Sequence, residues 1–173
     1  MMGKSGKKRQ KMVGNGKKCV PTKKSSNDNQ VVYTGQDEYR IDPSRRVMLP
    51  GRWRSDEKDF WVVPWPLGKR DCLMVVPEPR FQKTLEALSG KSLSDKAALA
   101  VQRVIGGTAQ QLTLDKAGRL LLPETLTNAV GIKSDALFVG MMDKFEIWDP
   151  KRHAAASVAD EAIAAEHVGG MDL

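Results

Sequence analysis

The alternation of apolar and polar residues predicts strands on both sides of two short polar turns. Residues alternate in this way over 38–41 and again over 111–114, with the period of two that is typical of a half-buried strand. An apolar run follows each turn and ends at Pro50 or Pro123. Proline cannot donate to a ladder in a central strand, so these runs should be short. The strands expected around the turns are 33–41, 47–49, 110–114 and 120–122.

Further apolar runs predict two hairpins and two short helical segments. The expected elements, in chain order, are one helical turn within 51–58, a hairpin of strands 60–63 and 72–76, a helix over 123–130, and a hairpin of strands 136–141 and 145–148. The hairpin turns coincide with Leu67–Asp71 and Asp143-Lys144, which are rich in turn-forming residues. Proline at the first position and Gly131 after the last favour the helix over 123–130.

A helical period appears in the middle and at the end of the chain. Apolar residues recur at i, i+4 and i+7 from Phe81, and Gly90 is the expected stop. A second helix should begin at Ser94 as N-cap and end at Gly106-Gly107. Asp149 followed by Pro150 predicts the start of a third, Ala-rich helix that runs to about His167 and stops at Gly169-Gly170.

The two polar turns are copies of one pattern. Asp42–Pro50 and Asp115–Pro123 both read Asp, three residues, Arg, three mostly apolar residues, Pro. A nine-residue pattern found twice is an internal repeat. Aspartate opens a turn well because its carboxylate can accept neighbouring backbone N–H groups. Asp42, Asp115 and Gly118 are therefore the expected turn-forming residues.

On these residues the chain resembles the MraZ family of bacterial transcriptional regulators, whose mark is a duplicated Asp-x-x-x-Arg turn. Three flanking segments are similar to the family as well: Pro50–Arg54 after the first turn, Gly106-Gly107 before the second strand pair, and the closing strand Phe145–Trp148. The resemblance covers about Tyr33 to His153.

The resemblance implies an α+β, β-rich fold in which two pseudo-symmetric AbrB-like (SpoVT-AbrB type) repeats form a split β-barrel, with bridging helices and a C-terminal helix. It also implies ring-shaped homo-oligomers and a cytoplasmic, nucleoid-associated repressor. Such a repressor binds short double-stranded DNA sites repeated in the promoter of the cell-division and cell-wall gene cluster. The expected organisation is a disordered basic arm over 1–32, a first repeat over 33–78, a helical bridge over 79–107, a second repeat over 108–150, and a C-terminal helix and tail over 151–173.

The first turn departs from the family pattern Asp-Ser-Lys-Gly-Arg. Ser44 stands in place of the lysine, and Arg45 stands in place of the glycine. Thr34, just before Gly35, stands where the family usually has an arginine. Glycine adopts a positive φ at little cost, whereas arginine does not. The shape of the first turn, and the DNA sequence that it would read, are therefore open at the level of sequence.

The net charge of +7 is concentrated at the N-terminus. Residues 1–30 hold nine basic residues and one acidic residue, while the 19 basic and 20 acidic residues that follow nearly cancel. The N-terminal segment has almost nothing apolar to bury and is expected to be disordered. It would be either an arm that grips phosphates without sequence preference, or a solvated tail, or the product of a wrongly chosen start codon.

The residues around the turns are candidates for DNA contact. Arginine offers a planar fork of donors that can make two bonds to a guanine edge or a phosphate. Five arginines fall within fifteen residues around the first turn with Asp42 as the one acid, whereas Asp115 and Glu124 oppose the bases of the second turn. The alternative is that each turn aspartate pairs with its arginine and stiffens the turn. The candidate DNA-binding residues are Arg40, Arg45, Arg46, Arg52, Arg54, Lys116 and Arg119.

The residue inventory disfavours an enzyme. His153 and His167 lie in the expected C-terminal helix without a partner Cys, Ser or Asp pattern, and there is no Gly-rich phosphate loop or metal-ligand spacing. Neither turn aspartate is followed by the Ser or Thr and Gly of an aspartic protease. No catalytic residue, metal, cofactor or small-molecule substrate is expected. Cys19 and Cys72 lie far apart, which argues against a disulfide framework, and no apolar run has the length of a membrane helix.

Three other interpretations remain open. Trp53, Trp61 and Trp65 could stack on bases, but their apolar neighbours favour a place in the core or between subunits. An antitoxin-like AbrB-fold module would need a toxin-binding tail, often acidic, whereas the tail here is basic and N-terminal. The basic arm alone could also coat nucleic acid non-specifically.

Overall fold

The computed structural model describes residues 31–69, 71–92 and 94–170. The basic arm expected over 1–32 lies outside these residues except for Val31 and Val32, as does Cys19. The strands are β1 (Gln36–Arg40), β2 (Arg46–Met48), β3 (Asp59–Trp65), β4 (Cys72–Pro77), β5 (Gln110–Thr113), β6 (Arg119–Leu121), β7 (Asp135–Gly140) and β8 (Phe145–Trp148). The helices are α1 (Glu78–Ser89), α2 (Lys96–Thr108), α3 (Glu124–Val130) and α4 (Pro150–His167), with 3₁₀ turns η1 (Gly51–Trp53) and η2 (Val168–Gly170).

Six strands form one antiparallel sheet, and the remaining two form a separate ribbon. The strand order of the sheet is β1-β7-β8-β4-β3-β5, and the ribbon pairs β2 with β6. The expected α+β, β-rich class is confirmed. The sheet does not close into a barrel, because β1 and β5 are its two edges.

The two sequence repeats are interleaved in space. β1 of the first repeat pairs with β7 of the second, β5 of the second pairs with β3 of the first, and β4 pairs with β8. The ribbon likewise takes one strand from each repeat. Each repeat therefore completes the sheet of the other, and the strand order reads the same from either edge when corresponding strands are exchanged.

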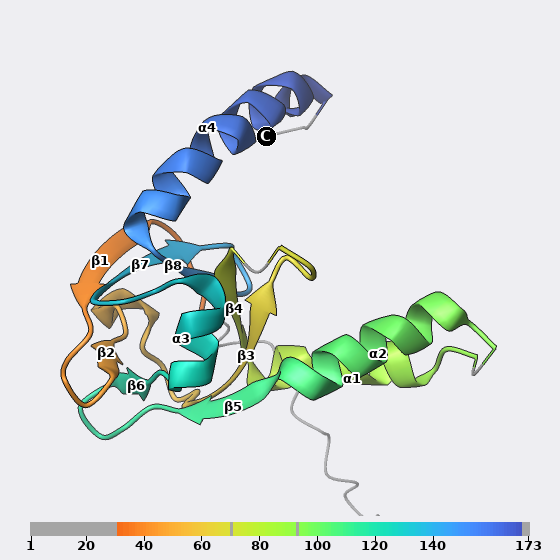
Figure 1. The fold of residues 1–173 in the computed structure, drawn as a ribbon, viewed down its shortest axis with the longest axis horizontal. Coiled ribbons are helices and arrows are strands. Elements are labelled where there is room, and N and C mark those ends of the chain that lie inside the picture. Colours follow the sequence, from red (N-terminus) through yellow and green to blue (C-terminus); the bar gives the residue numbers. More distant parts are fainter. Residues whose placement is uncertain (1–30, 70, 93, 171–173) are drawn as a thin grey trace, which may run out of the picture.

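The core packs between the sheet, the ribbon and α3, which lies against β3 and β4 (Figure 1). Aromatic rings gather at its centre, where Phe145 contacts Tyr33 at 5.2 Å, Trp53 at 5.2 Å and Phe60 at 5.8 Å between ring centroids. Trp53 is 1% exposed, so the preference for a core position is confirmed for this residue. Burial raises the pKa of Tyr33 to about 12, with the nearby Glu57 carboxylate acting in the same direction.

The first expected strand is shorter than its alternation suggested. Tyr33 forms only an isolated bridge to Met142, and β1 begins after Gly35, which has φ of 81°. The backbone at Tyr33 passes close to Gly140, since a Cβ built on Gly140 would lie 2.5 Å from the Tyr33 carbonyl oxygen.

The helical segments follow their predicted places with two corrections. The N-cap of α2 is Asp95 and not Ser94, because the Asp95 carboxylate accepts the Ala98 N–H at 3.0 Å. The same helix does not end at Gly106-Gly107 but continues to Thr108. It leads directly into β5 through Ala109, whose N–H binds the Ile105 carbonyl at 2.8 Å. α1 and α2 project together from one side of the sheet, and α4 projects from another (Figure 1).

A second apolar cluster ties the α1–α2 pair to the sheet. Val63, Val76 and Phe81 are buried there, and Trp61 stacks on Phe81 with centroids 4.6 Å apart and planes 14° from parallel. Trp61 also donates its indole N–H to Glu78. The tryptophan ring therefore packs within the fold, as expected.

Candidate nucleic-acid interface

The β2–β6 ribbon joins the two repeated turns. Val47 lies opposite Leu120, the residue at the same position of the other repeat. Their exposed fractions are 1% and 0%, so this pair anchors the ribbon to the core. Both turns are thereby fixed to one short, shared element.

The outward side of the ribbon carries four residues. Side chains alternate across a strand, and directly paired residues point to the same face. The residues flanking Val47 and Leu120 therefore share the opposite face, which is exposed or half-buried. We call this surface the ribbon face; its members are Arg46, Met48, Arg119 and Leu121. It carries one arginine from each turn with apolar side chains between them.

The two turns have the same backbone hydrogen bonds. Asp42 N–H binds the Arg46 carbonyl at 2.9 Å, and the corresponding bond from Asp115 to Arg119 is also 2.9 Å. Arg45 has φ of 61°, close to the 79° of Gly118. The replacement of glycine by Arg45 thus leaves the backbone shape of the first turn intact, a shape that the sequence alone left open.

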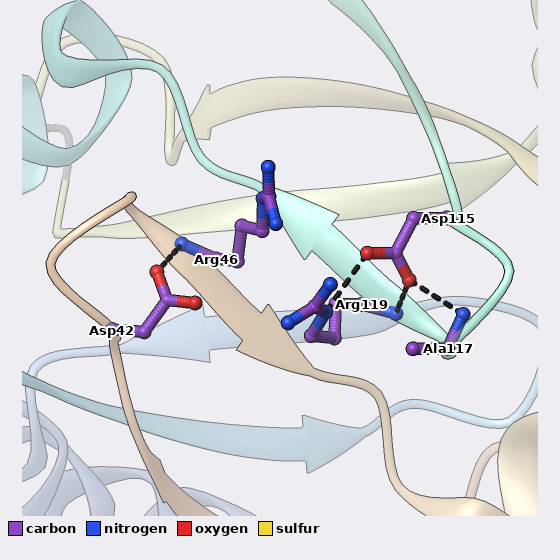
Figure 2. Close-up of polar contacts among 5 residues, drawn as sticks. All are labelled: Asp42, Arg46, Asp115, Ala117 and Arg119. Carbon is purple, nitrogen blue, oxygen red and sulfur yellow. Dashed lines mark hydrogen bonds and ion pairs between the residues drawn. The ribbon is translucent and has the colours of Figure 1, made fainter.

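The two turn carboxylates, Asp42 and Asp115, differ in the hydrogen-bond donors that they bind. Asp115 accepts the N–H groups of Ala117 and Arg119, each at 2.9 Å, and forms an ion pair with Arg119 Nε at 2.8 Å. Asp42 accepts the backbone N–H of Arg46 at 2.8 Å, and the Arg46 guanidinium extends away from it (Figure 2). The hydrogen bond from the Arg119 backbone N–H is the main cause that lowers the pKa of Asp115 below its usual 3.8. Desolvation opposes it, and the hydrogen bonds from the Arg119 side chain and the Ala117 N–H add to the lowering.

Apart from Arg119, the candidate DNA-binding residues fall into two groups. Arg54 donates to the Leu49 carbonyl through Nε at 3.0 Å and Nη2 at 2.9 Å. Arg52 donates to Asp37 and to the Thr34 carbonyl. Arg45 donates to the Leu122 carbonyl at 3.2 Å and to the Thr127 hydroxyl. These three guanidinium groups therefore donate hydrogen bonds to acceptors of the protein itself.

Arg40, Arg46 and Lys116 form the second group. All three are exposed, and their charged groups have no hydrogen bond or ion pair to any residue that the structure describes. Of these three, Arg46 is the member of the ribbon face. The expected alternative, an internal turn ion pair, is thus observed for Asp115–Arg119 and not for Asp42–Arg46.

Sequence reasoning missed Met48 and Leu121 as part of this surface. Leu121 is 54% exposed, whereas the adjacent Leu120 is fully buried. The period of two along the strand places each of them on the same side as the turn arginine, so the signal was present in the spacing.

The described residues offer little to other chemistries. Among them, no three His, Cys, Asp or Glu side chains lie close enough to hold a metal ion. Cys72 is buried and free, and burial together with Glu146 raises the pKa of its thiol. No helix in the described part of the chain is both long and apolar enough to span a membrane.

Comparison with known proteins points to one family. The family model described as "MraZ protein, putative antitoxin-like" matches residues 105–167. The "Transcriptional regulator MraZ" of Lachnoclostridium phytofermentans is 30% identical over 142 residues, which cover 82% of this chain and 99% of the relative. The proteins of that name from Deinococcus radiodurans and Thermomicrobium roseum are each 31% identical, covering 74% and 78% of this chain and 89% and 92% of the relatives.

Proposed function

Because the chain belongs to the MraZ family of transcriptional regulators, we propose that it binds double-stranded DNA sequence-specifically through the ribbon face. Arg46 is the principal base-reading residue of this proposal. The observation that carries it is the outward guanidinium of Arg46, which has no partner among the described residues (Figure 2), on a ribbon that is anchored in the core. Transcriptional regulators are not an enzyme class, in agreement with the residue inventory.

The geometry of the ribbon suits the major groove of DNA. That groove admits a two-stranded β-ribbon as well as a helix, and an arginine can bind the O6 and N7 atoms of guanine with two hydrogen bonds. Arg46 lies directly before Val47, which anchors the strand in the core, so its backbone is held in place while its long side chain can turn toward a base. Arg40 and Lys116, which are close to the two turns in the sequence, would contact phosphates and fix the register without reading sequence.

Arg119 has a different part in the proposal. Its guanidinium is held by Asp115, so contact with a base would require it to share or leave that ion pair. It would therefore add a weaker contact than Arg46. The two turns are symmetric in backbone but not in the freedom of their arginines, and the first repeat contributes most of the specificity.

One ribbon makes few contacts, so a homo-oligomer in the form of a ring completes the proposal. Linked copies raise affinity through effective concentration by ~10²–10⁴ and would select short sites repeated along a promoter. Exposed apolar side chains outside the ribbon face support burial between copies; they include Met142 at 68%, Val158 at 69% and Ile163 at 57%. Light scattering of the purified protein at micromolar concentration should give a multiple of the 19.1 kDa chain mass, and a monomer would contradict the ring.

The proposed target is the promoter of the cell-division and cell-wall gene cluster. Bound protein would block access of RNA polymerase and so act as a repressor. Its proposed location is the cytoplasm, in association with the nucleoid. Footprinting on DNA upstream of the protein's own gene tests this directly. Protection should appear at regularly spaced short repeats, and reporter expression should rise when the gene is deleted.

The Arg46→Lys variant separates base reading from simple charge. Lysine keeps the positive charge but cannot make the two parallel bonds of a guanidinium. The ratio of promoter affinity to random-DNA affinity should therefore fall, while binding to random DNA stays close to that of the wild type. An unchanged ratio would mean that Arg46 contacts only phosphates. If the protein instead acted as an antitoxin-like module, it would protect no promoter repeats and would copurify with a second, toxic protein.

A further inference from the structure

Each turn contains one residue with positive φ, and each of these residues faces the end of the ribbon strand from the other repeat. Leu122 donates its N–H to the Arg45 carbonyl at 2.9 Å, and Leu49 donates its N–H to the Gly118 carbonyl at 3.0 Å. Leu49 and Leu122 occupy corresponding positions directly before the prolines that close the two patterns. Their own carbonyl groups, both at fully buried residues, each need a donor.

An arginine supplies that donor in both halves, but from different positions. At Leu49 the donor is Arg54, which comes four residues after the first proline. At the corresponding position after the second proline the chain has Thr127, which is too short to reach the Leu122 carbonyl in the same way. There the donor is Arg45, from the turn of the opposite repeat.

The two arrangements exclude each other at any one turn. A Cβ built on Gly118 would lie 2.8 Å from Arg54 Nε and 2.9 Å from Arg54 Cζ, so any side chain at 118 would displace Arg54. The first turn has the opposite solution. Thr127 is small, so the guanidinium of Arg45 occupies the space beside the Leu122 carbonyl. The Thr127 hydroxyl accepts a hydrogen bond from Arg45 and donates one to the Glu124 carbonyl at 3.2 Å.

We propose that Arg45, matched to Thr127, is a positioning residue that holds the first turn in its left-handed conformation and so presents Arg46. The cost of a positive φ at a residue with a side chain is offset by contacts that only a guanidinium can make to both acceptors at once. Arg45 and Thr127 together replace the Gly118–Arg54 pair of the second turn. The consequence for DNA rests on the function proposed above; the consequence for the turn does not.

The test is a double-mutant cycle on the purified protein: wild type, Arg45→Gly, Thr127→Arg and the double variant. Arg45→Gly relieves backbone strain but removes the side-chain donor of the Leu122 carbonyl and the hydrogen bond that the Thr127 oxygen accepts, so its melting temperature should fall by about 2–6 °C. Thr127→Arg alone forces a second guanidinium into an occupied site at a residue that is 1% exposed and should be worse. The double variant recreates the Gly118–Arg54 arrangement and should melt within about 2 °C of the wild type.

The sign of the coupling decides the outcome. A double variant that melts no higher than Arg45→Gly overturns the proposal, and this comparison holds even if Thr127→Arg alone fails to fold. Arg45→Lys keeps the charge but offers one ammonium group in place of the fork; it should lower the melting temperature as well. Full stability of Arg45→Lys would mean that the bridging contacts are unimportant.

DNA affinity provides the readout of positioning. Arg45→Gly should weaken promoter binding about tenfold, and the double variant should recover to within about twofold of the wild type. If Arg45 acted only by touching phosphate, the double variant would stay weak and Arg45→Lys would bind normally, which would overturn its positioning role. If Arg46→Ala also bound promoter DNA normally, the proposed DNA-binding function would fail. The recovery of the melting temperature in the double variant would still establish that Arg45 holds the first turn in its conformation.

Discussion

The shared ribbon makes a sharp prediction about Leu120 and Leu121, two adjacent leucines on opposite faces of β6. Leu120 is 0% exposed and packs in the main core, whereas Leu121 is 54% exposed on the ribbon face. Truncating a buried leucine to alanine removes its transfer free energy and leaves a cavity, which together cost about 2–5 kcal/mol. Leu120→Ala should therefore lower the free energy of unfolding by this amount, while Leu121→Ala should change it by less than about 0.5 kcal/mol.

The measurement is denaturant unfolding of the two variants beside the wild type, followed by circular dichroism and tryptophan fluorescence. For a chain of this size the loss in Leu120→Ala corresponds to a melting temperature lower by roughly 5–15 °C. Hydrogen exchange adds a local test, because the N–H groups of Leu49 and Leu122 bind the opposite turns. Both should exchange faster in Leu120→Ala, since one ribbon supports both turns.

Two results would refute this reasoning. Equal losses for the two variants would mean that the ribbon does not divide into a buried and an open face. Faster exchange at Leu122 alone would mean that the turns are anchored separately and that the repeats are not coupled through the β2–β6 pair.

Further predictions concern the second turn and the arm. Arg119→Ala should weaken promoter binding less than Arg46→Ala and lower the melting temperature more, because its guanidinium is paired with Asp115; equal binding losses with unchanged melting would make both turns equal readers. The lowered pKa of Asp115 contributes stability that is present above about pH 4 and is lost as the pH falls through the folded-state pKa. Asp115→Asn should therefore be less stable than the wild type at neutral pH. In acid titrations its stability should fall less steeply below about pH 4 than that of the wild type. Deleting residues 1–32 should weaken binding to all DNA about equally and reduce the slope of log affinity against log salt by roughly three to four if half of its charges engage phosphates; an unchanged slope would identify a solvated tail.

The repeated turns could be predicted from the sequence because their chemistry is local. Aspartate opens each turn, alternation marks the flanking strands, and the pattern occurs twice in the sequence. The same locality predicted the start of α4, where Asp149 accepts the N–H groups of Lys151 and Arg152. These features depend on neighbours within a few residues.

The contacts that decide which arginine is free could not be predicted in this way. Arg45 binds partners 77 and 82 positions away in the chain, and no periodicity reports such a contact. For the same reason all five arginines around the first turn looked alike, although three of them are used inside the fold. The continuation of α2 through Gly106-Gly107 is similar in kind. Each glycine costs a helix about 1 kcal/mol, but packing of Ile105 against the second cluster and the direct junction with β5 outweigh that local preference.

The most direct test of the central claim is the affinity of the Arg46→Ala protein for its own promoter DNA, measured by fluorescence anisotropy beside Arg103→Ala. Arg103 is an exposed arginine on α2 whose side chain has no partner among the described residues, so the control removes the same charge away from the ribbon face. Arg46→Ala should raise the dissociation constant at least about fivefold, as expected for a lost two-bond base contact of ~1–3 kcal/mol, with unchanged melting and assembly. Arg103→Ala should bind as the wild type does. Equal affinities for Arg46→Ala and the wild type, in a protein that still assembles, would contradict the account.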